Sequence, residues 1–190
     1  MRLDAPRIAP LGPAQASEEQ RELFASLAAR GRPILNIFRT LANVPDAARA
    51  FLAWGGYVLS ERNDLDARLR ELAILRTGFN CGSGYEWTQH VPIGQRAGLS
   101  DAAIAAIKQG ADHEGWSPLE RAILQACDQL HTGQFIHDAT WNALAELGDK
   151  GRMDLVFTVG QYTQVSMMLN SFGVQLDEGQ SLDPDLDRRK

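Results

Sequence analysis

The sequence has little cysteine, few aromatic residues and no long apolar run. Of its 190 residues two are cysteines, and aromatic residues make up 7%. No stretch approaches the roughly 20 apolar residues that a membrane-spanning helix requires. The first residues also lack the apolar run of a secretory signal. We therefore expect a cytoplasmic protein that does not enter a membrane.

The charge pattern gives no sign of a nucleic-acid partner. The chain has 19 basic and 24 acidic residues, a formal charge of −5, and both signs are scattered along it. A nucleic-acid-binding surface needs lysine and arginine gathered on one face. Hydrophobic residues make up 44% and charged residues 23%, which is ordinary for a globular protein, and a chain of this length can bury the core of a single domain.

The two cysteines do not form a redox motif. Cys81 and Cys127 are far apart, and neither belongs to a C-x-x-C pair. A reducing compartment makes a disulfide between them unexpected. We interpret them as one thiol in a loop and one in the core.

No alternating strand pattern occurs, whereas apolar residues recur at helical spacings of three and four. The sequence therefore predicts an all-α, single-domain bundle. We expect an extended N-terminal arm at 1–16, a helical domain at 17–176, and a polar tail at 177–190 that is loose or reaches onto a neighbour. The expected helices cover about 18–29, 34–41, 46–59, 65–79, 85–97, 100–107, 118–131, 138–147 and 152–172.

Local signals support several of these helices. Ser17 with Gln20, and Ser117 with Glu120, have the spacing of a capping box, in which each residue satisfies a backbone N–H of the other. The helix at 46–59 is so apolar that we expect it in the interior. Its two adjacent glycines, at 55–56, indicate close approach of a neighbouring backbone or a ligand, and we favour close packing.

Polar residues cluster at a predicted helix–turn–helix hairpin. Ser83, Glu86 and His90 follow a glycine-bearing turn, and Glu86 and His90 lie one turn apart on one helix face. A carboxylate beside an imidazole raises its pKa and fixes its ring, which suits a general acid or base. The start of a helix also favours anions, so a carboxylated substrate is expected to bind there.

Other interpretations of these residues remain open. Ser83 and Glu86 also have capping-box spacing. His90, taken alone, is also compatible with a semi-buried histidine that has a structural role. Glu71, on the preceding helix, faces either solvent or His90 across the hairpin. No third metal ligand accompanies Glu86 and His90, so we expect no metal. The polar residues Gln161, Tyr162, Thr163, Gln164 and Asn170 either line a pocket or bond across a subunit interface.

The hairpin resembles the carboxymuconolactone decarboxylase family, which includes the alkylhydroperoxidase D (AhpD) branch. The resemblance is carried by residues 71–76, 80–90 and 97–100 and is most specific over 65–107. Peroxidase members have a glutamate, a C-x-x-C pair, and a histidine four residues after the second cysteine. Glu71 and His90 match the glutamate and histidine, but Ser83 and Glu86 fall on the cysteine positions.

The missing thiols make dithiol peroxidase chemistry unexpected, because it needs an attacking thiolate and a resolving thiol. The form Tyr85-Glu-Trp-x-x-His90 instead resembles the redox-inactive, decarboxylase-like branch. That resemblance implies an AhpD-like helical bundle with a central helix–turn–helix hairpin. It also implies a homo-oligomer (dimer, trimer or hexamer) with its site beside a subunit interface.

The activity implied is decarboxylation of a small carboxylated lactone in aromatic catabolism, without a cofactor. By the resemblance His90 protonates carbon, Glu86 and Glu71 orient it and stabilise its charge, and the substrate-binding residues are Ser83, Tyr85 and Trp87. Two alternatives are a non-catalytic helical oligomer that binds a small acid, and a peroxidase acting through Cys81.

Overall fold

The computed structural model describes residues 3–29, 31 and 33–187. All regular structure in this part of the chain is helical, which confirms the predicted all-α class. The α-helices are α1 (Glu18–Ala28), α2 (Asn36–Leu41), α3 (Pro45–Val58), α4 (Ala67–Asn80), α5 (Gly84–Arg96), α6 (Asp101–Gln109), α7 (Pro118–Gly133), α8 (Asp138–Ala143) and α9 (Gly148–Phe172). Four short 3-10 turns accompany them: Pro13–Gln15, Gly110–Asp112, Ala145–Leu147 and Pro184–Leu186. Each predicted helix is present, with its ends shifted by a few residues.

The helix starts follow the sequence signals. Ser17 and Ser117 each form the predicted capping box, with Gln20 and Glu120. Gly98 has a φ of 96°, a left-handed conformation that glycine adopts without strain, and it follows the end of α5. Local chemistry thus fixes where these helices begin and end.

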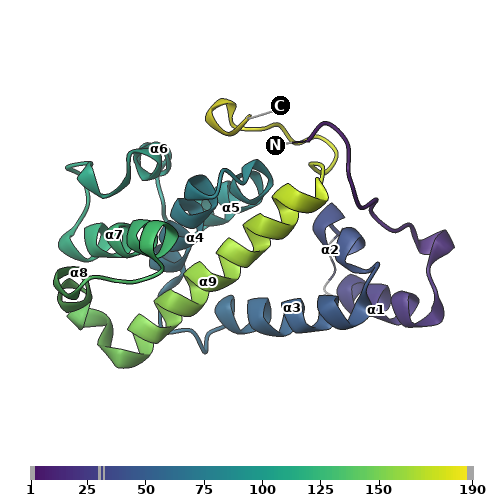
Figure 1. Ribbon diagram of the computed structural model, residues 1–190, viewed down its shortest axis with the longest axis horizontal. Helices are drawn as coiled ribbons and strands as arrows, with labels where there is room; N and C mark the ends of the chain where they lie inside the picture. Colours follow the sequence, from purple (N-terminus) through teal and green to yellow (C-terminus); the bar gives the residue numbers. More distant parts are fainter. Residues whose placement is uncertain (1–2, 30, 32, 188–190) are drawn as a thin grey trace.

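The long helix α9 organises the bundle. In Figure 1 it crosses the molecule diagonally, with α1 and α2 on one side and α4 to α8 on the other. The helix α4 packs against α5, α7 and α9, so it lies at the centre of the second group. None of the helices in the described residues is long and apolar enough to cross a membrane.

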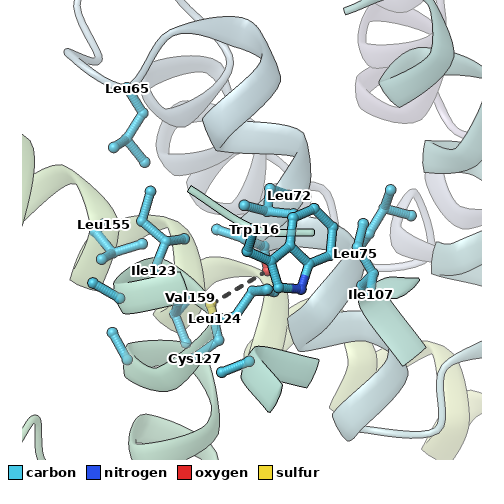
Figure 2. Packing of buried hydrophobic residues seen from close by; sticks show 14 of the residues in the cluster. Leu65, Leu72, Leu75, Ile107, Trp116, Ile123, Leu124, Cys127, Leu155 and Val159 are labelled. Carbon is cyan, nitrogen blue, oxygen red and sulfur yellow. Dashed lines mark hydrogen bonds between the residues drawn. The ribbon is translucent and has the colours of Figure 1, made fainter. Parts of the chain in front are cut away.

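Two separate apolar clusters flank α9. The larger joins α4, α6, α7 and the first half of α9, and Figure 2 shows Leu72 and Leu75 packed with Ile123, Leu124 and others. The smaller joins α1, α2 and α3 with the second half of α9. Between them lies a short third cluster of Val58, Ile74 and Tyr162. The hairpin residues singled out in the sequence lie beside this junction.

The expectation that α3 is an interior helix is wrong for the single chain. Only Ala48 and Val58 of this helix are buried, and Trp54 reaches the surface. Close packing at the glycine pair is also wrong, because a Cβ at Gly56 would meet nothing within 4 Å, and one at Gly55 would meet only the Gln161 amide, at 3.5 Å. The helix covers α9 with one face and leaves its other apolar residues open.

The C-terminal segment is docked, so the expectation of a loose tail is wrong for residues 177–187. Leu186 is fully buried in the larger cluster, and Lys108 binds both Asp183 and Asp185 at 2.7 Å. At the other end, the N-terminal arm lies against the end of α9, where the Arg7 and Ile8 N–H groups donate to the Phe172 carbonyl. Residues 1–2 and 188–190 of the predicted arm and tail lie outside the described residues.

Candidate active site

The hairpin of α4 and α5 is closed by a tight turn. Gly82 has a φ of 60°, and the Ser83 N–H donates to the Gly78 carbonyl at 2.9 Å. Gly78 also makes room for Glu86, whose Cγ would lie 3.5 Å from a Cβ at that position. The turn therefore brings the first two turns of α5 against the middle of α4.

His90 is held between two glutamates. Its Nδ1 lies 2.7 Å from Glu71 Oε2 and its Nε2 lies 2.9 Å from Glu86 Oε1. The three side chains are 9%, 1% and 5% exposed, in the order His90, Glu71, Glu86. Carboxylates only accept hydrogen bonds, so both ring nitrogens of His90 must carry a proton. We call these three residues the Glu–His–Glu cluster.

The electrostatics of the cluster favour the charged imidazole. Burial on its own lowers the pKa of His90, but the charge of Glu86, together with the hydrogen bond and charge of Glu71, outweighs it and raises the pKa to about 10. His90 is therefore a cation at neutral pH. With two carboxylates beside it, the cluster carries a net charge of −1.

Tyr162 of α9 covers the cluster. Its ring meets His90 edge-on, with ring centres 5.0 Å apart and planes at 86°. Burial, and then the charges of Glu86 and Glu71, raise the pKa of its hydroxyl, while Arg70 acts in the opposite direction. The sequence marked Tyr162 only as part of a polar group with two possible roles, and it gave no signal for Arg70.

Ser83 does not cap the helix, so the capping-box interpretation of Ser83 and Glu86 is wrong. Its side chain makes no capping bond although it precedes α5, and the Glu86 carboxylate binds His90 instead. The Ser83 hydroxyl is fully buried and has no hydrogen-bond partner within the described chain. On α9 the Gln161 amide and the Ser166 hydroxyl are also buried without a hydrogen-bond partner in the described chain.

Tyr85 and Trp87 lie on either side of Glu86 in α5 and have structural partners. The Tyr85 hydroxyl donates to Asp177 at 2.7 Å and accepts the Ile37 N–H at 3.4 Å. The Trp87 ring packs against Phe79, at a ring distance of 5.7 Å, within the larger apolar cluster. Each lies about 100° around the helix from Glu86. Their predicted contact with substrate stays a prediction, and this arrangement does not favour it.

The cysteines occupy a turn and the core. Cys81 follows α4, with its Sγ 3.8 Å from His131 Nδ1. Cys127 is fully buried, and burial raises its thiol pKa to about 12. Its Sγ contacts the Ala73 carbonyl oxygen at 3.8 Å, the dashed line of Figure 2. No disulfide joins Cys81 and Cys127.

Two further features of the described residues lie outside the cluster. No group of three or more His, Cys, Asp or Glu side chains among them is placed to hold a metal ion. An open cleft of about 400 Å³ is lined by residues of α4, α6, α7, α8 and the 3-10 turn Gly110–Asp112, and its one arginine, Arg76, is already paired with Asp128 at 2.6 Å. None of the predicted site residues lines this cleft.

Comparison with known proteins finds one family profile and several solved structures that this chain resembles. The sequence profile of the carboxymuconolactone decarboxylase family matches residues 45–129. No curated protein matches the sequence. The fold is similar to that of an uncharacterized peroxidase-related protein with an alkylhydroperoxidase AhpD core from Ralstonia eutropha JMP134. The TM-score is 0.78 and the identity 20%, over 91% of this chain and 93% of that one.

Two further structures share the fold. An uncharacterized peroxidase-related protein from Silicibacter sp. TM1040 has a TM-score of 0.74 at 14% identity, over 93% of this chain and 91% of that one. The debrominase Bmp8 has a TM-score of 0.73 at 15% identity, over 90% of this chain and 92% of that one. Residues 45–129, which hold the hairpin and the Glu–His–Glu cluster, therefore match the carboxymuconolactone decarboxylase family, within a chain that has the AhpD-like all-helical fold and lacks a C-x-x-C pair.

Proposed function

We propose that this protein is a cofactor-independent carboxy-lyase that removes CO2 from a small carboxylated γ-lactone. The observation that carries the proposal is the charged His90 held by two buried carboxylates. A buried imidazolium is a proton donor that stays loaded at neutral pH, and a decarboxylase of this kind needs such a donor at carbon. The family of residues 45–129 supports the same reaction class.

The reaction balances without an external electron carrier. The bond between the carboxylate carbon and the lactone ring breaks, and its electron pair enters the conjugated unsaturation of the ring. Negative charge then develops on the lactone carbonyl oxygen, where a hydrogen-bond donor stabilises it. A proton delivered to a ring carbon completes the product, and CO2 leaves.

The residues of the cluster have different parts in this reaction. His90 Nε2 is the donor atom, because Nδ1 points to Glu71 inside the hairpin. Glu86 holds Nε2 until substrate enters and must release it before the proton reaches carbon. Glu71 keeps the ring oriented throughout, and the unpartnered Ser83 hydroxyl is a donor for a substrate oxygen.

The test is CO2 release from 4-carboxymuconolactone by the wild type and by His90→Gln. General acid catalysis contributes about 10²- to 10⁴-fold, so we expect a loss of at least about 100-fold. The control is His137→Gln, an exposed histidine at the start of α8, which should keep full turnover. Full turnover by His90→Gln would show that the acid has been assigned to the wrong residue.

A second candidate function is binding of a small acid without turnover. It is favoured by one observation, that both nitrogens of His90 are already occupied by carboxylates in the resting structure. A carboxylated lactone that binds the wild type but is recovered unchanged would support this candidate.

We also propose that the protein is a homo-oligomer. Large apolar side chains are exposed together on α3 and α9: Trp54, Met153, Val156 and Phe157, with the Trp54 and Phe157 rings 6.2 Å apart. Contiguous apolar surface of this kind marks interaction sites. Light scattering should give a mass above the 20.9 kDa of one chain. Phe157→Glu should reduce that mass, while Phe135→Glu, at an exposed position outside this patch, should not; a monomeric wild type would contradict the proposal.

A further inference from the structure

The charge of the cluster creates a problem for an anionic substrate. The Glu–His–Glu cluster has a net charge of −1, so a carboxylate that approaches it is repelled unless a cation lies nearby. The charge of Arg70 acts on the buried Tyr162, which lies next to His90. Arg70 is therefore the candidate for this cation.

The position of Arg70 on α4 agrees with this assignment. Arg70 lies one residue before Glu71 and one turn before Ile74, so it shares a helix face with Ile74. Ile74 packs with Tyr162 in the small cluster between the two cores. Arg70 therefore lies one turn N-terminal to Ile74 on the face of α4 that meets α9.

Arg70 differs from the other arginines inside α4 in having no carboxylate partner in the described chain. Arg68 pairs with Glu120, and Arg76 pairs with Asp128. Arg70 makes one long hydrogen bond, from Nη1 to the Leu65 carbonyl at 3.4 Å, and its Nε is buried without any partner. A buried guanidinium N–H without an acceptor is costly, and an anionic ligand would satisfy it.

Tyr162 supplies a second donor without a partner. The residue is 4% exposed, and its hydroxyl makes no hydrogen bond to any residue that the structure describes. Burial and the glutamate charges keep this hydroxyl protonated by raising its pKa. A neutral hydroxyl and a guanidinium offer the O–H and N–H donors that a carboxylate accepts.

We propose that Arg70 and Tyr162 bind the carboxylate that the substrate retains, with His90 facing the ring carbon that is protonated. The identity of this ligand rests on the proposed function. The retained carboxylate fits better than the one that leaves, because an ion pair with the leaving group would be lost in the transition state. Such a pair would stabilise the ground state and slow the reaction.

The binding test uses two probes that cannot decarboxylate: γ-carboxymethyl-γ-butyrolactone, which carries only the retained carboxylate, and its neutral methyl ester. By calorimetric titration the wild type should bind the acid more tightly than the ester. Arg70→Met should weaken binding of the acid by about 10- to 100-fold, the range for a hydrogen bond to a charged group, and leave the ester unchanged. Arg70→Lys should recover part of the loss, and Tyr162→Phe should show a smaller loss.

The control is Arg96→Met, which removes an exposed positive charge from α5. The proposal is overturned if Arg70→Met binds the acid as the wild type does, if Arg96→Met shows the same loss, or if the wild type does not prefer the acid. Turnover separates this inference from the proposed function. CO2 release with an unchanged KM in Arg70→Met would refute only the inference, whereas Arg70-dependent binding without any CO2 release would refute only the decarboxylase.

Discussion

Replacing Glu71 by Gln should lower the pKa of His90 by about 1–3. The wild-type pKa is about 10, against an ordinary value of 6.5, a difference of about 3.5. Burial lowers the pKa of His90, so the two carboxylates together must raise this pKa by more than the difference. An opposite charge in contact typically shifts a pKa by about 1–3, so the pKa of His90 in Glu71→Gln should fall to between about 7 and 9. The amide keeps an oxygen that can accept the Nδ1 proton, so the ring geometry is retained.

The pKa can be measured by following histidine ring signals in NMR spectra as pH changes. The chain has four histidines, and the His90 signal is identified by its loss in His90→Gln. The control is Glu120→Gln, which removes another buried carboxylate, the partner of Arg68. It should leave the His90 pKa where it is. A His90 pKa that stays near 10 in Glu71→Gln would refute the role of the Glu71 carboxylate in stabilising the imidazolium.

The same change has a signature in stability. A pKa raised in the folded state stabilises the protein fully below the unfolded value, and this stability is lost as pH rises through the folded value. For wild-type His90 the window is therefore 6.5 to about 10, and the free energy of unfolding falls there by about 1.4 kcal/mol per pH unit. In Glu71→Gln the fall in the free energy of unfolding should end at a lower pH, between about 7 and 9. Denaturant titrations across this range measure it.

Three further substitutions test the packing around the site. Gln161→Met should raise the melting temperature by several degrees, because it removes two buried amide atoms without partners. The control is Gln164→Met, where the amide contacts Met168 Sδ. A melting temperature of Gln161→Met below that of the wild type would contradict the expectation. Leu186→Ala should lower the free energy of unfolding by about 2–5 kcal/mol, and no loss would mean that the tail is not part of the core. Tyr85→Phe should speed amide exchange in residues 177–187, because Asp177 loses its hydroxyl donor; unchanged exchange would remove Tyr85 as the anchor.

The sequence allowed the hairpin to be predicted because its determinants are local. Glu86 and His90 are one turn apart, and a helix forces them onto one face. The contact of Glu71 with His90 crosses a single short turn, so burial of both side chains leaves few other partners. The capping interpretation of Ser83 failed because it used spacing alone, and the buried His90 competes for the Glu86 carboxylate.

The missed features depend on contacts between distant segments. Tyr162 reaches His90 only because α9 folds back over α5, and no periodicity in the sequence specifies that crossing. The tail is polar along its length, and a single apolar residue, Leu186, enters the core, so its pattern does not predict docking. The apolar composition of α3 indicated burial, but composition does not distinguish the interior of one chain from a surface that another copy covers.

The residues at the two cysteine positions favour proton transfer over thiol chemistry at this site. Glu86 replaces the thiol nearer to the histidine, and its carboxylate now shares the Nε2 proton of His90. Cys127 cannot act as a resolving thiol, because it is fully buried and its pKa of about 12 keeps it protonated. Cys81 lies on the turn, with its sulfur next to His131 and not in the cluster. The hairpin therefore has a glutamate and a histidine in contact and no thiol at either cysteine position, an arrangement compatible with the proposed cofactor-free decarboxylation.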